Sequence, residues 1–138
     1  MLSIDKFLAC ESFAVAGAST DRSKYGNIVF RALRDSGRDT TPIHPHADFI
    51  EGSKAYPSLA DAPRPPEALS IVTRPEVTRD IIGQALQLGI RYVWMQPGAE
   101  DAIASRLARE AGITVIDDGS CILVSLAREG HRAERNQP

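Results

Sequence analysis

An apolar run broken by one glycine constrains the fold of this chain more than any other feature. Residues 13–16 are apolar, Gly17 ends the run, and a polar stretch follows as far as about Tyr25. Apolar residues then return with helical spacing, at Ile28, Val29, Ala32 and Leu33. The pattern predicts a strand, a glycine turn and the start of a helix.

This junction predicts a site for phosphate. The first backbone N–H groups of a helix have no partner within the helix, and the helix dipole favours negative charge at that end. Positive side chains in the same loop strengthen the expectation. We therefore expect a phosphate-bearing nucleotide cofactor to bind here. The residues expected to hold it are Gly17, Ala18, Ser19, Arg22, Lys24, Tyr25 and Gly26.

The junction is not a complete dinucleotide-binding fingerprint. The pattern G-x-G-x-x-G would place glycines at positions 19 and 22, where this chain has Ser19 and Arg22. A second interpretation is a solvated loop in which Asp21 or Ser23 caps the helix. Both interpretations stay open at the level of the sequence.

The same alternation continues along the chain. Strands are expected over about 12–16, 40–44, 68–72, 90–95 and 113–116. Helices are expected within 1–10, over 25–36, from Pro75 to Gly89, up to Ala111 and over 122–128. Residues 47–66 carry Gly52 and several prolines, which leaves a short extended piece at 54–56 and a turn at 58–61. Residues 130–138 have almost no apolar side chain and are expected to form a loose tail.

This order of elements predicts an α/β fold. Strands that alternate with helices form a parallel sheet, and right-handed crossovers put helices on both of its faces. We expect a single doubly wound sheet of about five strands, which is a Rossmann-like architecture. The chain has no internal repeat and no linker, so residues 1–138 are expected to be one domain.

Composition narrows the functional classes. The 16 basic and 18 acidic residues give a net charge of −2, so no positive field attracts nucleic acid or an anionic membrane. No apolar run approaches the roughly 20 residues of a membrane span, and the first residues lack a signal-peptide pattern. The cytoplasm is the expected compartment. Cys10 and Cys121 form no C-x-x-C pair, so no metal or redox motif is expected, and Cys10 reads as a packed thiol.

The segments that follow the strands are the candidates for chemistry, because ligands of open α/β sheets bind beyond the carboxyl ends of the strands. These segments are 17–24, 44–46, 73–75, 96–98 and 117–121. An NAD site would place an acid after the second strand, where this chain has His44-Pro45-His46 and only Asp48 nearby. A ribose that carries an extra phosphate fits better, as in NADP or coenzyme A. The two histidines have no apparent third partner, so no metal site is expected.

Six short segments, in order, resemble the small CoA-binding domain proteins, which are related to the N-terminal domain of the succinyl-CoA synthetase alpha subunit. They are Gly17-Ala18-Ser19, Lys24-Tyr25-Gly26-Asn27, His44-Pro45, Ala55-Tyr56-Pro57-Ser58-Leu59, Ile71-Val72-Thr73-Arg74-Pro75-Glu76 and Val93-Trp94-Met95-Gln96-Pro97-Gly98-Ala99. The resemblance extends over about residues 13–116. It implies a Rossmann-like domain that binds CoA.

By matching position, the resemblance assigns roles to residues of this chain. Ala18, Ser19 and the loop through 24–26 would hold phosphates, and His44 with Pro45 would lie near the adenosine. Thr73, Arg74 and Pro75 would contact the nucleotide or the pantetheine, while Gln96 and Pro97 would edge the crevice. The chain departs from the family in two places. Residues 117–124 lack the usual basic residue and acid–histidine pair, and His44 replaces a frequent asparagine.

The preferred hypothesis is a CoA or acyl-CoA binding module without catalysis, in a regulatory or carrier role. The hypothesis allows such a module to bind a protein partner or a second copy of this chain. One alternative is a small NADP(H)-dependent oxidoreductase. Another is a CoA-dependent enzyme that uses Cys121 as its nucleophile. No base lies near Cys121 in sequence, and the preceding Asp117 and Asp118 disfavour a thiolate, so we expect a packing role for it and assign no catalytic residue.

Overall fold

Five parallel strands form the centre of the protein in the computed structural model, which describes residues 2–135. The strands are β1 (Ser12–Ala16), β2 (Asp39–Ile43), β5 (Ala68–Ile71), β6 (Tyr92–Met95) and β7 (Thr114–Ile116). Their order in the sheet is β2-β1-β5-β6-β7, and every pair is parallel. The predicted α/β fold with a doubly wound parallel sheet is confirmed.

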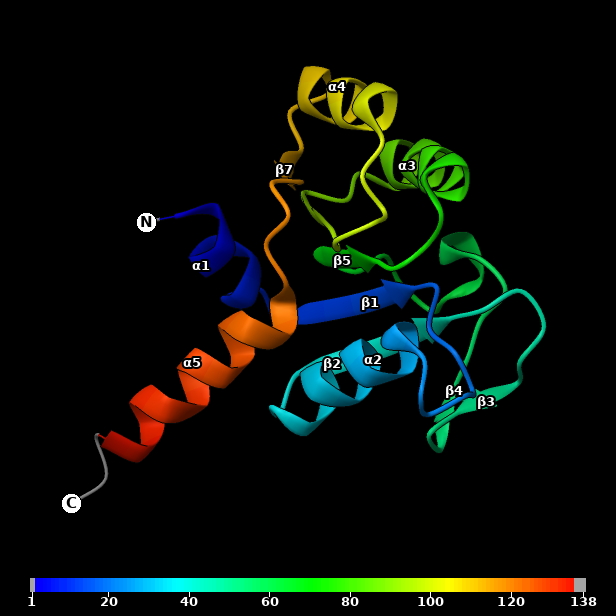
Figure 1. Ribbon diagram of the computed structural model, residues 1–138. Helices are drawn as coiled ribbons and strands as arrows, with labels where there is room; N and C mark the ends of the chain where they lie inside the picture. The colour runs from blue at the N-terminus through cyan, green and yellow to red at the C-terminus, as the bar shows by residue number, and fades with distance from the viewer. Residues whose placement is uncertain (1, 136–138) are drawn as a thin grey trace.

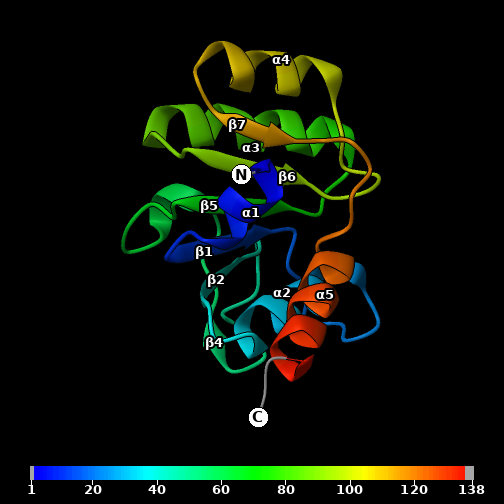
Figure 2. The same ribbon diagram turned by 90° about the vertical axis from the view of Figure 1, so that its left-hand side faces the viewer.

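Helices cover both faces of this sheet. They are α1 (Ser3–Leu8), α2 (Tyr25–Asp35), α3 (Pro75–Leu88), α4 (Ala102–Glu110) and α5 (Ile122–Arg135). Figures 1 and 2 show α3 and α4 on one face, with α1, α2 and α5 on the other. None of the helices in residues 2–135 has the length and apolar character needed to cross a membrane.

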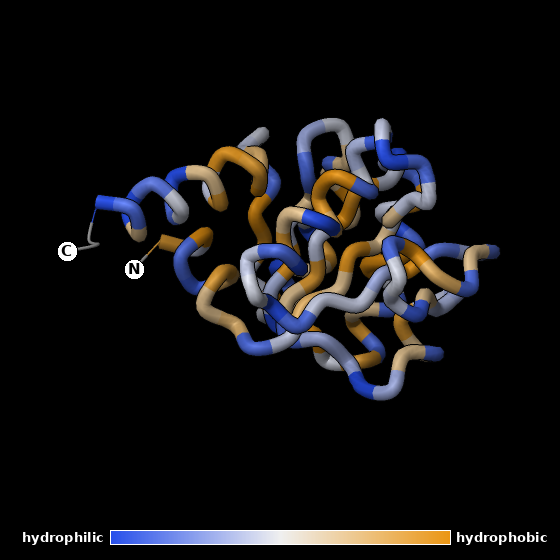
Figure 3. Tube along the Cα trace, turned by 90° about the horizontal axis from the view of Figure 1, so that it is seen from below, coloured by the Kyte–Doolittle hydropathy of each residue, from blue (hydrophilic) through white to orange (hydrophobic). Residues whose placement is uncertain are grey.

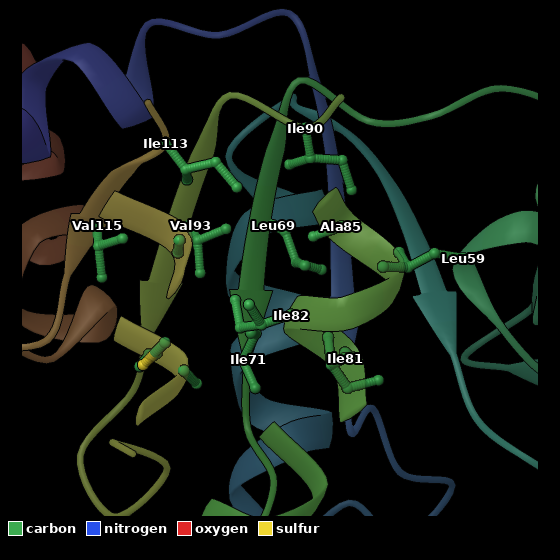
Figure 4. Close-up of a cluster of buried hydrophobic side chains, with 14 of the residues drawn as sticks. Leu59, Leu69, Ile71, Ile81, Ile82, Ala85, Ile90, Val93, Ile113 and Val115 are labelled. Carbon is green, nitrogen blue, oxygen red and sulfur yellow. The ribbon is translucent and has the colours of Figure 1, made fainter. Parts of the chain in front are cut away.

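Alternate residues of each strand supply two separate cores. In β1, Ala14 and Ala16 pack toward α3 and α4, whereas Phe13 and Val15 pack toward α1 and α2. Figure 4 shows the first core, where Ile81 and Ile82 of α3 meet the central strands. Because the strands are buried on both faces, their sequences are nearly continuous apolar runs.

Helix ends follow the local chemistry of the sequence. Pro75 occupies the first turn of α3, where its missing N–H costs nothing, and Gly89 ends that helix with φ 69°. The side chain of Asp101 caps α4 by accepting the backbone N–H of Ala104 at 2.9 Å.

The structure differs from the sequence prediction in two segments. Within the stretch predicted to be irregular, β3 (Phe49–Ile50) and β4 (Ser53–Lys54) form a small antiparallel hairpin, and a 3-10 helix, η1 (Leu59–Asp61), lies where a turn was expected. The predicted loose tail is wrong for residues 130–135, because α5 continues to Arg135; residues 136–138 lie outside the described residues. Figure 3 shows the change from hydrophobic to hydrophilic residues along α5.

Strand order identifies where a ligand would bind. From β1 the chain first crosses to β2 on one side and later returns to β5 on the other side of β1. The connections therefore diverge at the carboxyl ends of β1 and β5. Sheets with this order bind ligands at that point.

Candidate functional site

A cleft of about 480 Å³ opens at the carboxyl ends of β1 and β5. Three segments and the end of β5 surround it: the turn after β1, the start of α2 and the segment after β2. The lining residues are Gly17, Ala18, Ser19, Lys24, Tyr25, Gly26, His44, Pro45 and Val72. All of them except Val72 are residues that the sequence singled out.

Two glycines allow the turn after β1 to pack closely. Gly17 has φ 90°, and a Cβ atom there would lie 2.0 Å from the carbonyl oxygen of Val72. A Cβ atom on Gly26 would lie 2.0 Å from the carbonyl oxygen of Gly17. A side chain at Gly17 would push the turn away from the end of β5, and a side chain at Gly26 would push the start of α2 away from the turn, so glycine is required at both.

Buried Asn27 holds the loop between these glycines. Its Nδ2 donates a hydrogen bond to the carbonyl oxygen of Ser19 at 2.8 Å, and its Oδ1 accepts one from Arg31 Nε at 2.7 Å. Arg31 also donates to the carbonyl oxygen of Arg22 at 3.1 Å. Side chains from the first two turns of α2 therefore hold the loop in place through its carbonyl oxygens.

The N-terminus of α2 carries no side-chain cap. Lys24 is the N-cap residue and makes no capping hydrogen bond. Asp21 instead accepts hydrogen bonds from the backbone and side chain of Ser23, at 3.0 and 2.7 Å, and these bonds lower the pKa of Asp21. The interpretation in which Asp21 or Ser23 caps the helix is therefore wrong.

Backbone N–H groups around the cleft are left for a ligand. Within residues 2–135, no protein acceptor takes the N–H groups of Ala18, Ser19, Tyr25 or Gly26. The helix dipole and the ammonium group of Lys24 add positive potential at the same place. Such a set of donors suits the oxygens of a phosphate or a diphosphate.

His44, which also lines the cleft, presents a hydrogen-bond donor. Its Nδ1 accepts the backbone N–H groups of His46 and Ala47 at 3.0 and 2.9 Å. The proton of the neutral ring is consequently on Nε2. A ligand group that meets this nitrogen must accept a hydrogen bond, as a phosphate oxygen or a ring nitrogen does.

A second hollow, of about 370 Å³, adjoins the cleft. Tyr25 and Val72 line both spaces, and the remaining lining residues are Thr73, Arg74, Pro75, Pro97, Gly98 and Ala99. The hydroxyl groups of Thr73 and Thr78 share a hydrogen bond of 2.7 Å. The two spaces therefore lie next to each other at the carboxyl edge of the sheet.

Tyr25, which separates the two spaces, is held from behind by Gln96 and Cys121. Its hydroxyl lies 2.7 Å from Cys121 Sγ and donates to Gln96 Oε1 at 3.3 Å. The same Gln96 oxygen accepts the backbone N–H of Ile122 at 3.0 Å, and its Nε2 donates to Ser70 Oγ. Burial and the contact with Cys121 raise the pKa of Tyr25, so its hydroxyl stays protonated.

The structure places most of the predicted residues around this edge, with two exceptions. Gln96 is fully buried and lies behind Tyr25, so it does not edge the crevice itself. Arg22 lines neither space, and its Nε lies 3.6 Å from Glu51 Oε1. Sequence reasoning missed Glu51, which belongs to no motif. It included Asn27 in the segment 24–27 but gave it no role, because Asn27 acts through hydrogen bonds to the loop and to Glu51.

Residues 2–135 contain no group of three or more His, Cys, Asp or Glu side chains that could hold a metal ion. The thiol of Cys121 contacts the hydroxyl of Tyr25, which is a weak base. The chemistry that the arrangement offers best is the binding of an anion by backbone N–H groups.

Comparison with known proteins gives an independent result. A family model described as "CoA binding domain" matches residues 11–127. The uncharacterized protein YneT of Bacillus subtilis (strain 168) is 30% identical over 114 residues, which cover 83% of this chain and 84% of YneT.

Two archaeal proteins extend the comparison. The solved structure of a hypothetical protein from Pyrococcus horikoshii OT3 has a TM-score of 0.84 at 30% identity and covers 96% of this chain and 92% of that one. The alpha subunit of acetate–CoA ligase [ADP-forming] II from Pyrococcus furiosus is 28% identical over 91 residues. These residues are 65% of this chain and 20% of that subunit.

Proposed function

Because this chain belongs to the CoA-binding domain family, we propose that its cleft and the adjoining hollow bind coenzyme A or an acyl-CoA. The module binds this ligand without transforming it, in a regulatory or carrier role. The phosphates lie between the turn after β1 and the start of α2. The adenosine lies by His44 and Pro45, and the pantetheine extends past Tyr25 toward Thr73, Pro75 and Pro97.

One observation carries the proposal: backbone N–H groups that have no protein acceptor within residues 2–135 lie beside Lys24, at the point where the strand connections diverge. Polyanions gain from such a site because the donors are already oriented before the ligand arrives. The absence of a side-chain cap on α2 supports the same conclusion, because a capping side chain would accept hydrogen bonds from the N–H groups that a phosphate needs.

The second candidate is NADP(H), which also carries a diphosphate and an extra ribose phosphate. The donor on His44 Nε2 favours a phosphate-bearing ribose over the plain ribose of NAD, whose hydroxyls bind best to an acid. This observation does not distinguish NADP(H) from CoA, so the two ligands must be compared in a binding experiment.

Calorimetric titration of the purified chain with CoA, acetyl-CoA, NADPH and NADH tests the proposal. We expect saturable binding of CoA or acetyl-CoA and none of NADH. Binding of NADPH with no response to CoA would reject the proposal in favour of an oxidoreductase.

A separate assay addresses catalysis. Acetyl-CoA incubated with the protein should release no free thiol beyond the sum of two controls read with the same thiol reagent, acetyl-CoA without protein and each protein variant without acetyl-CoA, because Cys10 and Cys121 are themselves free thiols. Release that disappears in Cys121→Ala would show that the chain is a CoA-dependent enzyme instead.

A further inference from the structure

Glu51, at the tip of the β3–β4 hairpin, lies against the loop that follows β1. Its Oε2 accepts a hydrogen bond from Asn27 Nδ2 at 3.3 Å, and its Oε1 lies 3.6 Å from Arg22 Nε. Figure 1 shows the loop after β1 passing beside this hairpin before α2 begins. The hairpin therefore adds an acid to the loop that we propose for phosphate binding.

The hairpin turn fixes the backbone of Glu51. Glu51 and Gly52 are the two residues between the paired Ile50 and Ser53, and their φ angles of 50° and 80° are those that such a turn requires. Arg34 Nη1 donates to the carbonyl oxygen of Glu51 at 2.6 Å. The Glu51 side chain is 17% exposed, so the carboxylate is held in place and is not free in solvent.

A fixed carboxylate beside a phosphate site opposes the ligand in two ways. It repels the negative charge of the ligand, and it occupies Arg22, the other cation of the loop. The ion pair itself is weak, because its N–O distance is long and the Arg22 side chain is 66% exposed. A phosphate offers Arg22 a shorter contact through two oxygens and a larger charge.

We propose that Glu51 sets the affinity of the cleft for its ligand by holding Arg22 outside it. On binding, a ligand phosphate replaces the Glu51 carboxylate as the partner of Arg22. This inference rests on the proposed function. It makes Glu51 a positioning residue that acts through Arg22, and it explains why Arg22 belongs to the loop and yet lines neither space.

Glu51→Gln tests the inference, because glutamine keeps an oxygen for Asn27 and removes the charge. Titration of the full chain with CoA near 0.15 M salt should show binding about two- to fivefold tighter than in the wild type, the scale of a weak ion pair. Arg22→Ala should weaken binding, and Glu51→Gln should lose most of its gain in the Arg22→Ala background. Thermal melting of each variant checks that it folds.

Salt dependence supplies a readout that a purely structural role of Glu51 would not change. In the wild type, binding exchanges the Arg22–Glu51 ion pair for one between Arg22 and the phosphate, whereas in Glu51→Gln it forms that ion pair without breaking another. Glu51→Gln should therefore steepen the loss of affinity with salt, and Arg22→Ala should flatten it. If Glu51→Gln binds CoA more weakly than the wild type, or if it gains the same affinity with and without Arg22, the inference is wrong but the proposed function stands. A wild-type chain that does not bind CoA overturns the proposed function as well.

Discussion

A Cβ atom on Gly26 would lie 2.0 Å from the carbonyl oxygen of Gly17, so the first turn of α2 rests directly on the turn after β1. The contact is backbone against backbone, and no flexible side chain can yield to relieve a clash. Because both glycines line the cleft, the contact that closes the turn also sets the spacing of its backbone donors.

Gly26→Ala should therefore reduce both stability and ligand binding. Overpacking typically costs about 1–3 kcal/mol, and the upper part of this range is expected because a carbonyl group must move. Chemical unfolding measures the free energy of unfolding, and titration with CoA measures the binding. Wild-type behaviour in both assays would contradict the close packing of the two turns.

Gly83 supplies the matched control for this substitution. It lies inside α3, and a Cβ atom there would meet no atom within 4 Å. Gly83→Ala should raise the free energy of unfolding by about 0.5–1 kcal/mol, because alanine favours the helix, and should leave CoA binding unchanged.

Gln96 joins four segments of the structure and should be costly to replace. Gln96→Leu would leave the N–H of Ile122 and the hydroxyl of Ser70 without their partner and free the hydroxyl of Tyr25 from one of its contacts. The free energy of unfolding should fall by about 2–3 kcal/mol, the cost of buried polar groups left unpaired.

The control for this prediction is Gln87→Leu on the exposed surface of α3. It should change the free energy of unfolding by less than about 0.5 kcal/mol. If the two leucine variants were equally stable, the hydrogen bonds of Gln96 would contribute nothing to the fold.

Much of the fold was predictable because apolar periodicity is a local signal. The runs at 12–16 and 68–71 are buried on both faces, and Gly17 follows the first of them. Once these segments are parallel strands, strand order and the divergence of connections bring residues far apart in sequence to one edge. Lys24 and His44 were therefore found from the sequence, and the structure places both around one cleft.

Other features depend on contacts that no local pattern records. The strands of the β3–β4 hairpin have two residues each, too few for a period to be visible. Glu51 reaches Asn27 across 24 positions of sequence, and nothing near either residue indicates the pair. The last turns of α5 have no apolar face, so nothing in that stretch of sequence indicated that the helix continues. The ion pair between Arg38 and Glu129 holds that helix against the rest of the protein, and it joins residues far apart in sequence.

Arg109 and Asp117 should make stability depend on pH. Two hydrogen bonds of 2.7 and 3.0 Å join them, and the Arg109 guanidinium lowers the pKa of Asp117 below its ordinary 3.8. A lowered pKa means that the pair stabilises the fold above the ordinary value and loses this effect as pH falls through the folded value.

Asp117→Asn should therefore lower the free energy of unfolding by about 0.5–1 kcal/mol at pH 7, a small figure because Arg109 is half exposed. The difference from the wild type should shrink as pH falls below about 4. Asp80→Asn, on exposed α3 surface, serves as the control and should show no such trend. A deficit that stayed constant from pH 7 to pH 3 would exclude the ion pair as its cause.

Lys24 is the cation that lines the cleft directly, at the N-cap of the uncapped helix α2. Lys24→Ala should weaken CoA binding by about 1–3 kcal/mol, the scale of a lost charge-assisted contact. Stability should change little, because Lys24 is exposed and its side chain caps nothing.

Lys6→Ala removes the same charge from α1, outside both spaces, and separates a local contact from a general loss of positive potential. The two variants have equal net charge, so a difference in their CoA affinities at the same salt concentration reports the position of the charge. Equal affinities would place the phosphates away from Lys24. The backbone donors of the turn after β1 would then have to bind them without a side-chain cation.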